Sequence, residues 1–564
     1  MKNKWILWKA VITFGVFAFL GLGAAACDNP TNNNDGGNNN NGGSDTSGVE
    51  SGFIYRKIGD VSMITGYLGA GYYGTVPREL TIPGRLGGLP VAVIGDSAFR
   101  GKGLTAVTIP GSVTVIGRDA FRQNRLTSVE IPGSVVSIGD SAFSYNSLAS
   151  VTIPDSVTTI GASAFSYNSL ASVTIPSSVT SIEASVFSFN SLASVGFPNS
   201  VTTIGSNAFY NNRLASVDIP DSVTVIGSGA FGNNRLTSVD IPDSVTSIGL
   251  GAFRNNSLTS VDIPASVVSI GIEAFADNDG LTNINVSSDN INLSSKDGVL
   301  YNKAGTTLLA WPKGKSPVII PNGVIVIGAS AFSGNGLTSV TIPDSVTTIG
   351  NSAFYGNSLT SVSIGNGVTS IGASAFWRNS LTFVVLPDGL TSIGLRAFSE
   401  NSLTSVIIPG NVTNIEPGAF ESNNIASVTI PDGITSIGGL AFYHNRLTEV
   451  TIPSSVVSIG NYAFADNDLT SINIPASVTS IGWGAFSVND LTSVTIPNSV
   501  TSIGNSTFSR NIITKVTIGE NADIGDNLSM GTYGTAFKEL YDGKPGNEQA
   551  GTYTYAAGVW TKTE

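Results

Sequence analysis

A unit of about 22 residues repeats along most of this chain. It reads roughly L-T-S-V-T-I-P-x-S-V-T-x-I-G-x-x-A-F-x-x-N-x. Its first position is occupied by Leu104, Leu126, Leu148, Leu170, Leu192, Leu214, Leu236 and Leu258, and again from Leu337 to Ile513 after a slip at Leu281 and an insertion. A fixed period of this length is typical of a solenoid, in which each repeat is one coil that must stack on its neighbours to bury its apolar edge.

Within one repeat, the residue pattern predicts short strands joined by turns. Val129 and Ile131 alternate with polar residues, as the inward side chains of a strand do, and Pro132 ends the ladder because it lacks an N–H. A second apolar stretch ends at Gly139, which we expect to supply a backbone turn. Phe143 then places a large ring inside the coil.

A phenylalanine and an asparagine recur at fixed places of the coil. The phenylalanines are Phe99, Phe121, Phe143, Phe165, Phe187, Phe209, Phe231, Phe253 and Phe275, then Phe332, Phe354, Phe376, Phe398, Phe420, Phe442, Phe464, Phe486 and Phe508. We expect these rings to stack into one continuous aromatic spine. An asparagine stands three residues after most of them, where it can bond the free backbone groups of its own turn and of the next coil. Both columns are interpreted as structural.

The N-terminus has the features of an export signal. Three lysines precede an apolar run at residues 10–22, and small residues lead to Cys27, the single cysteine of the chain. This arrangement resembles a bacterial lipobox, in which the cysteine is lipidated, although Ala24 stands where a leucine is usual. We therefore expect residues 1–26 to be a lipoprotein-type signal peptide. Ordinary secretion or an uncleaved anchor are the alternatives.

Residues 27–51 are rich in asparagine and glycine and have no apolar periodicity. Such a segment cannot bury enough apolar surface to fold alone. We expect it to be a flexible tether that holds the repeats away from a membrane.

Composition excludes several classes of function. The net charge is −12, which argues against nucleic acid as a partner because phosphates demand a basic face. With no cysteine besides Cys27, the mature chain has no thiolate zinc site and no cysteine nucleophile. Protein and glycan partners remain open.

The repeat L-x-x-V-x-I-P-x-S-V-x-x-I-G-x-x-A-F-x-x-N resembles the BspA-like, spirochaete-type leucine-rich repeat over roughly residues 53–519. In that family the place of the asparagine is often held by cysteine. The resemblance implies a right-handed leucine-rich-repeat β-solenoid, related to the α/β horseshoe, with about 18 coils and little helix. It also implies a bacterial surface protein that binds host or partner macromolecules.

These features predict a linear organisation. An N-terminal cap and first repeat (52–103) are followed by repeats (104–282), a β-hairpin-like insert (283–317), further repeats (318–519) and an aromatic C-terminal cap (520–564). The insert is expected to cap or kink the stack, or to add a binding lobe. A separate export or attachment signal is the alternative for the C-terminal segment.

The sequence contains no constellation typical of catalysis. The one histidine, His444, occupies a variable and exposed slot between Phe442 and Asn445. Nucleophile-elbow, zinc-protease and phosphate-loop motifs are absent from the sequence. We expect no enzymatic activity and no cofactor, apart from the calcium hypothesis that follows.

Aspartates stand before the I-P pair in three successive coils, at Asp218, Asp240 and Asp262. Like charges about 5 Å apart repel unless a cation or a basic partner intervenes, so a weak Ca²⁺ site is one interpretation. The preferred interpretation is a solvated face that Arg213 and Arg235 partly neutralise.

Aromatic residues fill one slot in three adjacent coils, at Tyr145, Tyr167 and Phe189. They are a candidate stacking platform for a sugar or a peptide. A self-stacking row at the rim of the solenoid is the more ordinary interpretation.

The preferred binding site lies in the coils that begin at Leu359, Leu381 and Leu403, which lose their polar face. An apolar and aromatic patch amid serine and threonine is typical of an interface, whereas drift in a redundant array is the alternative. The candidate residues are Tyr355, Trp377, Arg378, Phe383, Val385 and Ile407.

We therefore expect an exported, lipid-anchored protein of the bacterial cell envelope that mediates macromolecular binding or adhesion. Its partners would be protein or glycan, it would contact the membrane only through the lipid on Cys27, and it would not bind nucleic acid. A structural spacer of the envelope without a specific ligand is the alternative.

Overall fold

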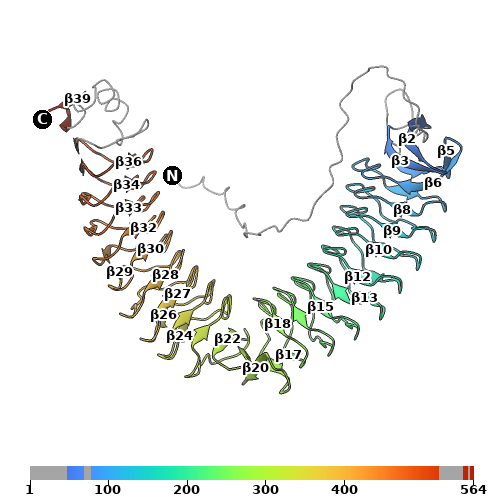
Figure 1. The fold of residues 1–564 in the computed structure, drawn as a ribbon, viewed down its shortest axis with the longest axis horizontal. Helices are drawn as coiled ribbons and strands as arrows, with labels where there is room; N and C mark the ends of the chain where they lie inside the picture. Colours follow the sequence, from blue (N-terminus) through green and yellow to red (C-terminus); the bar gives the residue numbers. More distant parts are fainter. Residues whose placement is uncertain (1–46, 69–77, 520–550, 557–558, 564) are drawn as a thin grey trace, which may run out of the picture. The chain divides into compact units, whose positions relative to one another are not determined.

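The computed structural model describes residues 47–68, 78–519, 551–556 and 559–563. These residues belong to one compact unit, Asp45–Glu564. The predicted signal peptide and Cys27 lie outside them. The unit is a β-solenoid of about 19 turns spaced 22 residues apart. Figure 1 shows its successive coils lying side by side, and none of the described residues forms a helix that could cross a membrane.

Each coil places a short strand directly before the repeat glycine position, and most neighbouring strands of this set pair in parallel and in register, as Ile204 does with Ile226. We call them the glycine-side ladder. Its strands are β6 (Leu89–Ile94), β8 (Val115–Ile116), β9 (Ser137–Ile138), β10 (Thr159–Ile160), β12 (Ser181–Ile182), β14 (Thr203–Ile204), β15 (Val225–Ile226), β16 (Ser247–Ile248), β18 (Ser269–Ile270), β23 (Val326–Ile327), β25 (Thr348–Ile349), β27 (Ser370–Ile371), β28 (Ser392–Ile393), β30 (Asn414–Ile415), β32 (Ser436–Ile437), β33 (Ser458–Ile459), β34 (Ser480–Ile481) and β36 (Ser502–Ile503).

A second set of strands ends at or near the I-P pair, and it forms in only some of the coils. We call it the proline-side ladder. Its strands are β4 (Glu79–Thr81), β7 (Ala106–Thr108), β11 (Ser172–Thr174), β13 (Ser194–Gly196), β17 (Ser260–Ile263), β19 (Asn283–Val286), β24 (Ser339–Thr341), β26 (Ser361–Ser363), β29 (Ser405–Ile407), β31 (Ser427–Thr429), β35 (Ser493–Ile496) and β37 (Lys515–Ile518).

The phenylalanine rings stack along the interior of the solenoid, with neighbouring centroids 5.0 to 5.8 Å apart. The spine is not continuous, because the insert interrupts it after Phe275. The second run opens with Trp311, whose ring lies 5.4 Å from that of Phe332. The expectation of one unbroken spine was therefore wrong, since it ignored the chain inserted between the two runs.

Each asparagine of the repeat joins two coils by hydrogen bonds. Asn124 Nδ2 donates to the carbonyl oxygens of Phe99 and Phe121 at 2.8 and 2.9 Å. Its Oδ1 accepts from the backbone N–H of Leu104 at 3.0 Å. Leu104 opens the same repeat as Asn124, whereas Phe99 belongs to the preceding one. The expected bridge between coils is therefore confirmed, but it runs to the coil before. These backbone groups are buried, and leaving one unsatisfied costs about 1–3 kcal/mol.

Two residues of each turn adopt the left-handed backbone conformation, although most are not glycine. In one coil they are Asp119, with φ of 54°, and Gln123, with φ of 58°. The slot of Gln123 in the next coils holds Tyr145 and Tyr167, with φ of 56° and 55°. This conformation costs roughly 1–2 kcal/mol for an ordinary residue, so the stacked turns on either side must impose it.

The glycine after each glycine-side strand opens a turn and also lies very close to the neighbouring coil. The Gly139 carbonyl accepts from the Ala142 N–H at 3.2 Å. A Cβ on Gly139 would lie 2.6 Å from the backbone nitrogen of Arg118, while its φ is not left-handed. The expected turn is therefore present, and the close approach of the neighbouring coil is what a Cβ would hinder. Glutamate takes the place of this glycine in two coils, at Glu183 and Glu416, so the close approach disfavours a side chain there but does not exclude one.

The N-terminal cap is a meander of three strands, β1 (Ser47–Glu50), β2 (Phe53–Ile58) and β3 (Val61–Tyr67). Antiparallel pairs join them, and β3 then pairs in parallel with β6. Strand β6 pairs in parallel with β8 as well and antiparallel with the short β5 (Arg85–Leu86). Because β1 lies within residues 27–51, the folded chain begins inside the segment assigned to the tether.

The insert is an antiparallel sheet rather than one hairpin. Its strands are β20 (Leu293–Lys296), β21 (Val299–Asn302) and β22 (Thr307–Ala310), and β22 continues into the glycine-side ladder through β23. Leu300 packs into the core of the coils before the insert, whereas Val299 and Tyr301 pack into the core of the coils after it. The sheet is therefore a partition between two cores.

The described part of the C-terminal cap is a hairpin, β38 (Gly551–Ala556) and β39 (Val559–Lys562). Strand β38 pairs antiparallel with β37, the last coil strand. Tyr553 and Trp560 are buried in the same core as the preceding coils. The pair covers the final coil, as the aromatic composition predicts.

Replacing Asn423 with alanine should destabilise the solenoid by about 3 kcal/mol. The change leaves the buried Leu403 N–H and the Phe398 and Phe420 carbonyls without their hydrogen-bond partner. Asn424 is the matched control. It is the next residue, is partly exposed and makes none of these bonds, so Asn424→Ala should cost less than about 0.5 kcal/mol. Urea unfolding and hydrogen exchange at the Leu403 amide measure both. Equal losses in the two variants would contradict the bridging role.

Candidate functional site

Three apolar side chains of the preferred site project into solvent from neighbouring coils. Phe383 is 55% exposed, Val385 73% and Ile407 71%. Alternation along the chain explains this, since the intervening Val384 and the following Leu386 are buried. The structure thus places these three residues on the outer face of the proline-side ladder, where most other coils carry serine, threonine, or an acidic or amide side chain.

A groove of about 1040 Å³ lies beside two of these residues. Phe383 and Val385 line it at one end. Outward hydroxyl groups from β24 and β26 also line it, from Ser339, Thr341, Ser361 and Ser363. The groove therefore combines an apolar end with a hydroxyl-bearing surface, which suits an amphipathic ligand.

Tyr355, Trp377 and Arg378 do not line this groove, and they form a separate cluster on the turns. Arg378 pairs with Glu400 at 3.1 Å and donates to the Tyr355 hydroxyl at 3.3 Å. The guanidinium groups of Arg378 and Arg396 lie 4.7 and 5.7 Å from the centre of the Trp377 ring. The structure thus divides the six-residue site into an apolar patch and a turn cluster whose members are engaged with one another.

The turn cluster continues to Glu421, which pairs with Arg396 at 3.3 Å. Burial raises the pKa of Glu421 above its ordinary value, and the neighbouring Glu400 adds to the rise, whereas Arg396 opposes it. The carboxyl group therefore holds its proton more tightly in the folded chain than in the unfolded one.

The aromatic row is self-stacked. The rings of Tyr145 and Tyr167, and those of Tyr167 and Phe189, lie 4.3 Å apart and nearly parallel. The outer ring faces are also in contact, with Arg122 on Tyr145 and the edge of Tyr210 on Phe189. Burial, followed by a hydrogen bond with Tyr145, raises the pKa of Tyr167. The row can offer a ligand its edges rather than an open ring face.

The aspartates remain exposed at their strand positions. Asp240 and Asp262 line a groove of about 370 Å³ with Asp243, and Asn285 Nδ2 donates to Asp262 Oδ1 at 2.8 Å. Asp218 lies outside that lining. Across the described ranges, no group of three or more histidine, cysteine or acidic side chains is arranged to hold a metal ion. The calcium site stays a prediction.

His444 forms a hydrogen bond with the neighbouring coil. Its Nδ1 lies 2.5 Å from Asp466 Oδ2, and both side chains are exposed. Asp466 occupies the equivalent position one coil later, so this contact joins the turns of two neighbouring coils. The contact therefore gives His444 a structural role between coils.

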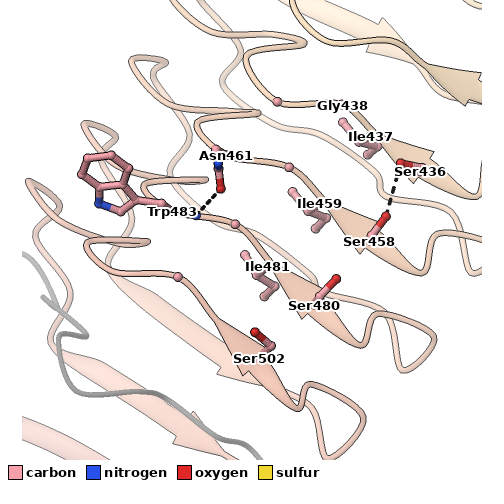
Figure 2. A pocket seen from close by; sticks show the side chains of 14 residues that line it. Ser436, Ile437, Gly438, Ser458, Ile459, Asn461, Ser480, Ile481, Trp483 and Ser502 are labelled. Carbon is pink, nitrogen blue, oxygen red and sulfur yellow. Dashed lines mark hydrogen bonds between the residues drawn. The ribbon is translucent and has the colours of Figure 1, made fainter. Parts of the chain in front are cut away.

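Sequence reasoning missed an exposed tryptophan on the glycine-side ladder. Trp483 follows the repeat glycine and is 50% exposed. It stands at the edge of a groove of about 610 Å³ over β32, β33, β34 and β36, shown in Figure 2. The sequence signal was available, because most other coils carry a small or polar residue in this slot.

Comparison with known proteins places the repeats in one family. The model for the BspA type leucine-rich repeat region, in six copies, matches residues 92–215, 202–303, 314–426 and 413–532, which is more than half of the chain. No curated protein matches.

Several solved structures are similar to this chain. A leucine-rich cell surface protein from Faecalibacterium prausnitzii A2-165 is 25% identical, with a TM-score of 0.36, over 78% of this chain and 95% of that one. A leucine-rich repeat protein from Bacteroides ovatus ATCC 8483 is 20% identical, with a TM-score of 0.38, over 73% and 94%. A leucine-rich repeat protein from T. pallidum is 27% identical, with a TM-score of 0.25, over 42% and 91%.

Replacing Glu421 with glutamine should stabilise the solenoid at neutral pH. Because the folded pKa of Glu421 is raised, its favourable contribution is present below the unfolded value of about 4.3 and is lost as the pH rises through the folded value. The gain should therefore disappear in acid. Urea midpoints at neutral and acidic pH measure this, with Glu449→Gln, at an exposed position outside the turn cluster, as the control. A loss of stability at neutral pH would show that the Arg396 pair outweighs burial.

Proposed function

This chain belongs to the BspA-type leucine-rich repeat family, as its repeats indicated, and from that membership we propose that it is a surface protein that binds a macromolecular partner and catalyses no reaction. Leucine-rich repeat solenoids are typically binding proteins, because stacked coils present a long, rigid surface. The partner class is protein or glycan.

The observation that carries this proposal is the apolar patch of Phe383, Val385 and Ile407. Three neighbouring outward slots hold large apolar side chains, each more than half exposed, on a face where most other coils carry polar or acidic side chains. Contiguous exposed apolar groups with a polar surround mark interaction surfaces, and an aromatic side chain is the usual anchor. The groove beside Phe383 supplies hydrogen-bonding groups for the rest of the ligand.

The turn cluster has a supporting role in this proposal. Arg378 donates to both Glu400 and Tyr355, and the guanidinium groups of Arg378 and Arg396 lie over the ring of Trp377. These contacts hold the turns of adjacent coils in register and so fix the strands that carry the patch.

A spacer of the envelope without a specific ligand is the second candidate function. The near identity of most coils favours it, because a selective site needs coils that differ. The apolar patch favours binding instead, since its coils replace the polar outward residues of the repeat by large apolar ones.

The proposed location is the bacterial cell surface, with a lipid on Cys27 as the anchor. The lysines, the apolar run and the small residues before Cys27 support export and lipidation. The asparagine- and glycine-rich segment would then separate the solenoid from the membrane.

Restoring the polar face should abolish partner binding without unfolding the solenoid. The variant Phe383→Ser, Val385→Thr and Ile407→Thr installs side chains found at these slots in other coils. Affinity for whichever immobilised matrix protein, cell surface or polysaccharide binds the wild type should fall by about tenfold or more. Val268→Thr with Val457→Thr is the matched control, because both valines are exposed but lie away from the patch. Unchanged affinity in the triple variant would remove the patch as the contact site.

Cys27→Ser should prevent lipidation and release the protein from the membrane fraction. Metabolic labelling with a fatty-acid analogue in a bacterial host, followed by fractionation, measures both effects. An unlabelled wild-type protein would contradict the anchor, and ordinary secretion would then explain the N-terminal signal.

A further inference from the structure

Four coils near the C-terminal end form an uncharged groove on the glycine-side ladder. Its volume is about 610 Å³, and every lining residue is serine, glycine, isoleucine, asparagine or tryptophan. A ligand with phosphate, sulfate or basic groups would find no opposite charge among these residues. The surface therefore suits a neutral, hydrogen-bonding ligand.

A row of hydroxyl groups follows one side of this groove, as Figure 2 shows. The strands pair in parallel and in register, so each coil adds one serine, at a spacing of about 4.8 Å. Ser458 Oγ donates to Ser436 Oγ at 3.2 Å, which leaves the other hydroxyls to a ligand. The row consists of Ser436, Ser458, Ser480 and Ser502.

The side chain at the position after the repeat glycine becomes larger across three adjacent coils, from Gly439 to Asn461 to Trp483. This edge of the groove thus has no side chain at Gly439 and an indole two coils later. Asn461 Oδ1 accepts from the Trp483 backbone N–H at 2.8 Å, so its Nδ2 remains available as a donor.

The indole of Trp483 is held in place while half of its surface stays in solvent. Its ring centre lies 5.3 Å from that of Tyr462, and Tyr462 in turn lies 6.4 Å from Tyr443. In Figure 2 the ring projects beyond Asn461 at the edge of the groove, away from the serines. A supported, exposed aromatic ring beside polar groups is a stacking surface for an apolar ring face.

We propose that this groove binds a neutral polysaccharide. One sugar ring stacks its C–H face on Trp483, and Asn461 Nδ2 binds a hydroxyl of the same segment. The adjoining sugars lie over the glycine floor towards the serine row, whose hydroxyl groups exchange hydrogen bonds with theirs. This site is on a different ladder from the apolar patch, and it does not depend on the partner proposed for that patch.

The test uses the full chain with dextran, mannan and xyloglucan as neutral probes and hyaluronan as the charged comparison. Saturable binding to at least one neutral probe is expected by calorimetry. Trp483→Asn, which installs the residue of the preceding coil, should weaken it by about tenfold or more. Trp483→Phe keeps a ring and should retain most of the affinity. Ser458→Ala with Ser480→Ala should weaken it independently of the indole.

Leu250→Asn is the matched control, because Leu250 fills the same slot of another coil and is 56% exposed. It should leave the affinity unchanged. Unchanged affinity in Trp483→Asn would overturn the proposal. So would binding to hyaluronan alone, or no binding to any neutral probe at its solubility limit. Capture of a protein that the polysaccharides do not displace would assign the groove to a protein partner instead.

Discussion

The stack depends on the asparagine that bridges each coil to the one before it. A solenoid coil has no helix to satisfy its backbone internally, so the turn leaves an N–H and two carbonyls facing the core. One carboxamide has the two donors and the acceptor that these groups need, and Asn212 shows the same bonds as Asn124. The phenylalanine rings fill the interior beside these bridges. The stability of the solenoid then depends on the contacts of each coil with its two neighbouring coils.

Because the inward asparagine and phenylalanine columns stabilise the fold, the outward residues are free to differ between coils. Function is therefore expected where an outward slot departs from the repeat, as at Phe383 and Trp483, rather than in a cavity. A rigid parallel ladder also fixes the distance between such slots. Each proposed site thus arises from one or two substitutions on a surface whose geometry is already set.

The two proposed sites differ in chemistry because their faces differ. At the apolar patch, Val385 and Ile407 lie next to an aromatic side chain, which suits the apolar anchor of a partner. At the Trp483 groove, the single aromatic ring stands beside uncharged hydroxyl and amide groups, which suits a sugar. Neither site brings together the charged groups that acid–base chemistry needs.

The sequence alone determined the solenoid, its period, the inward columns and the exposure of Phe383, because repetition makes the inward and outward slots readable from a single chain. It did not determine how slots combine in space. Trp377 and Phe383 are close in the chain, yet one packs between arginines on a turn and the other faces solvent on a strand position. The left-handed turn residues, the partition formed by the insert and the groove beside Trp483 also depend on how neighbouring coils meet. Only tertiary structure decided these features, since each arises from contacts between residues about one coil apart.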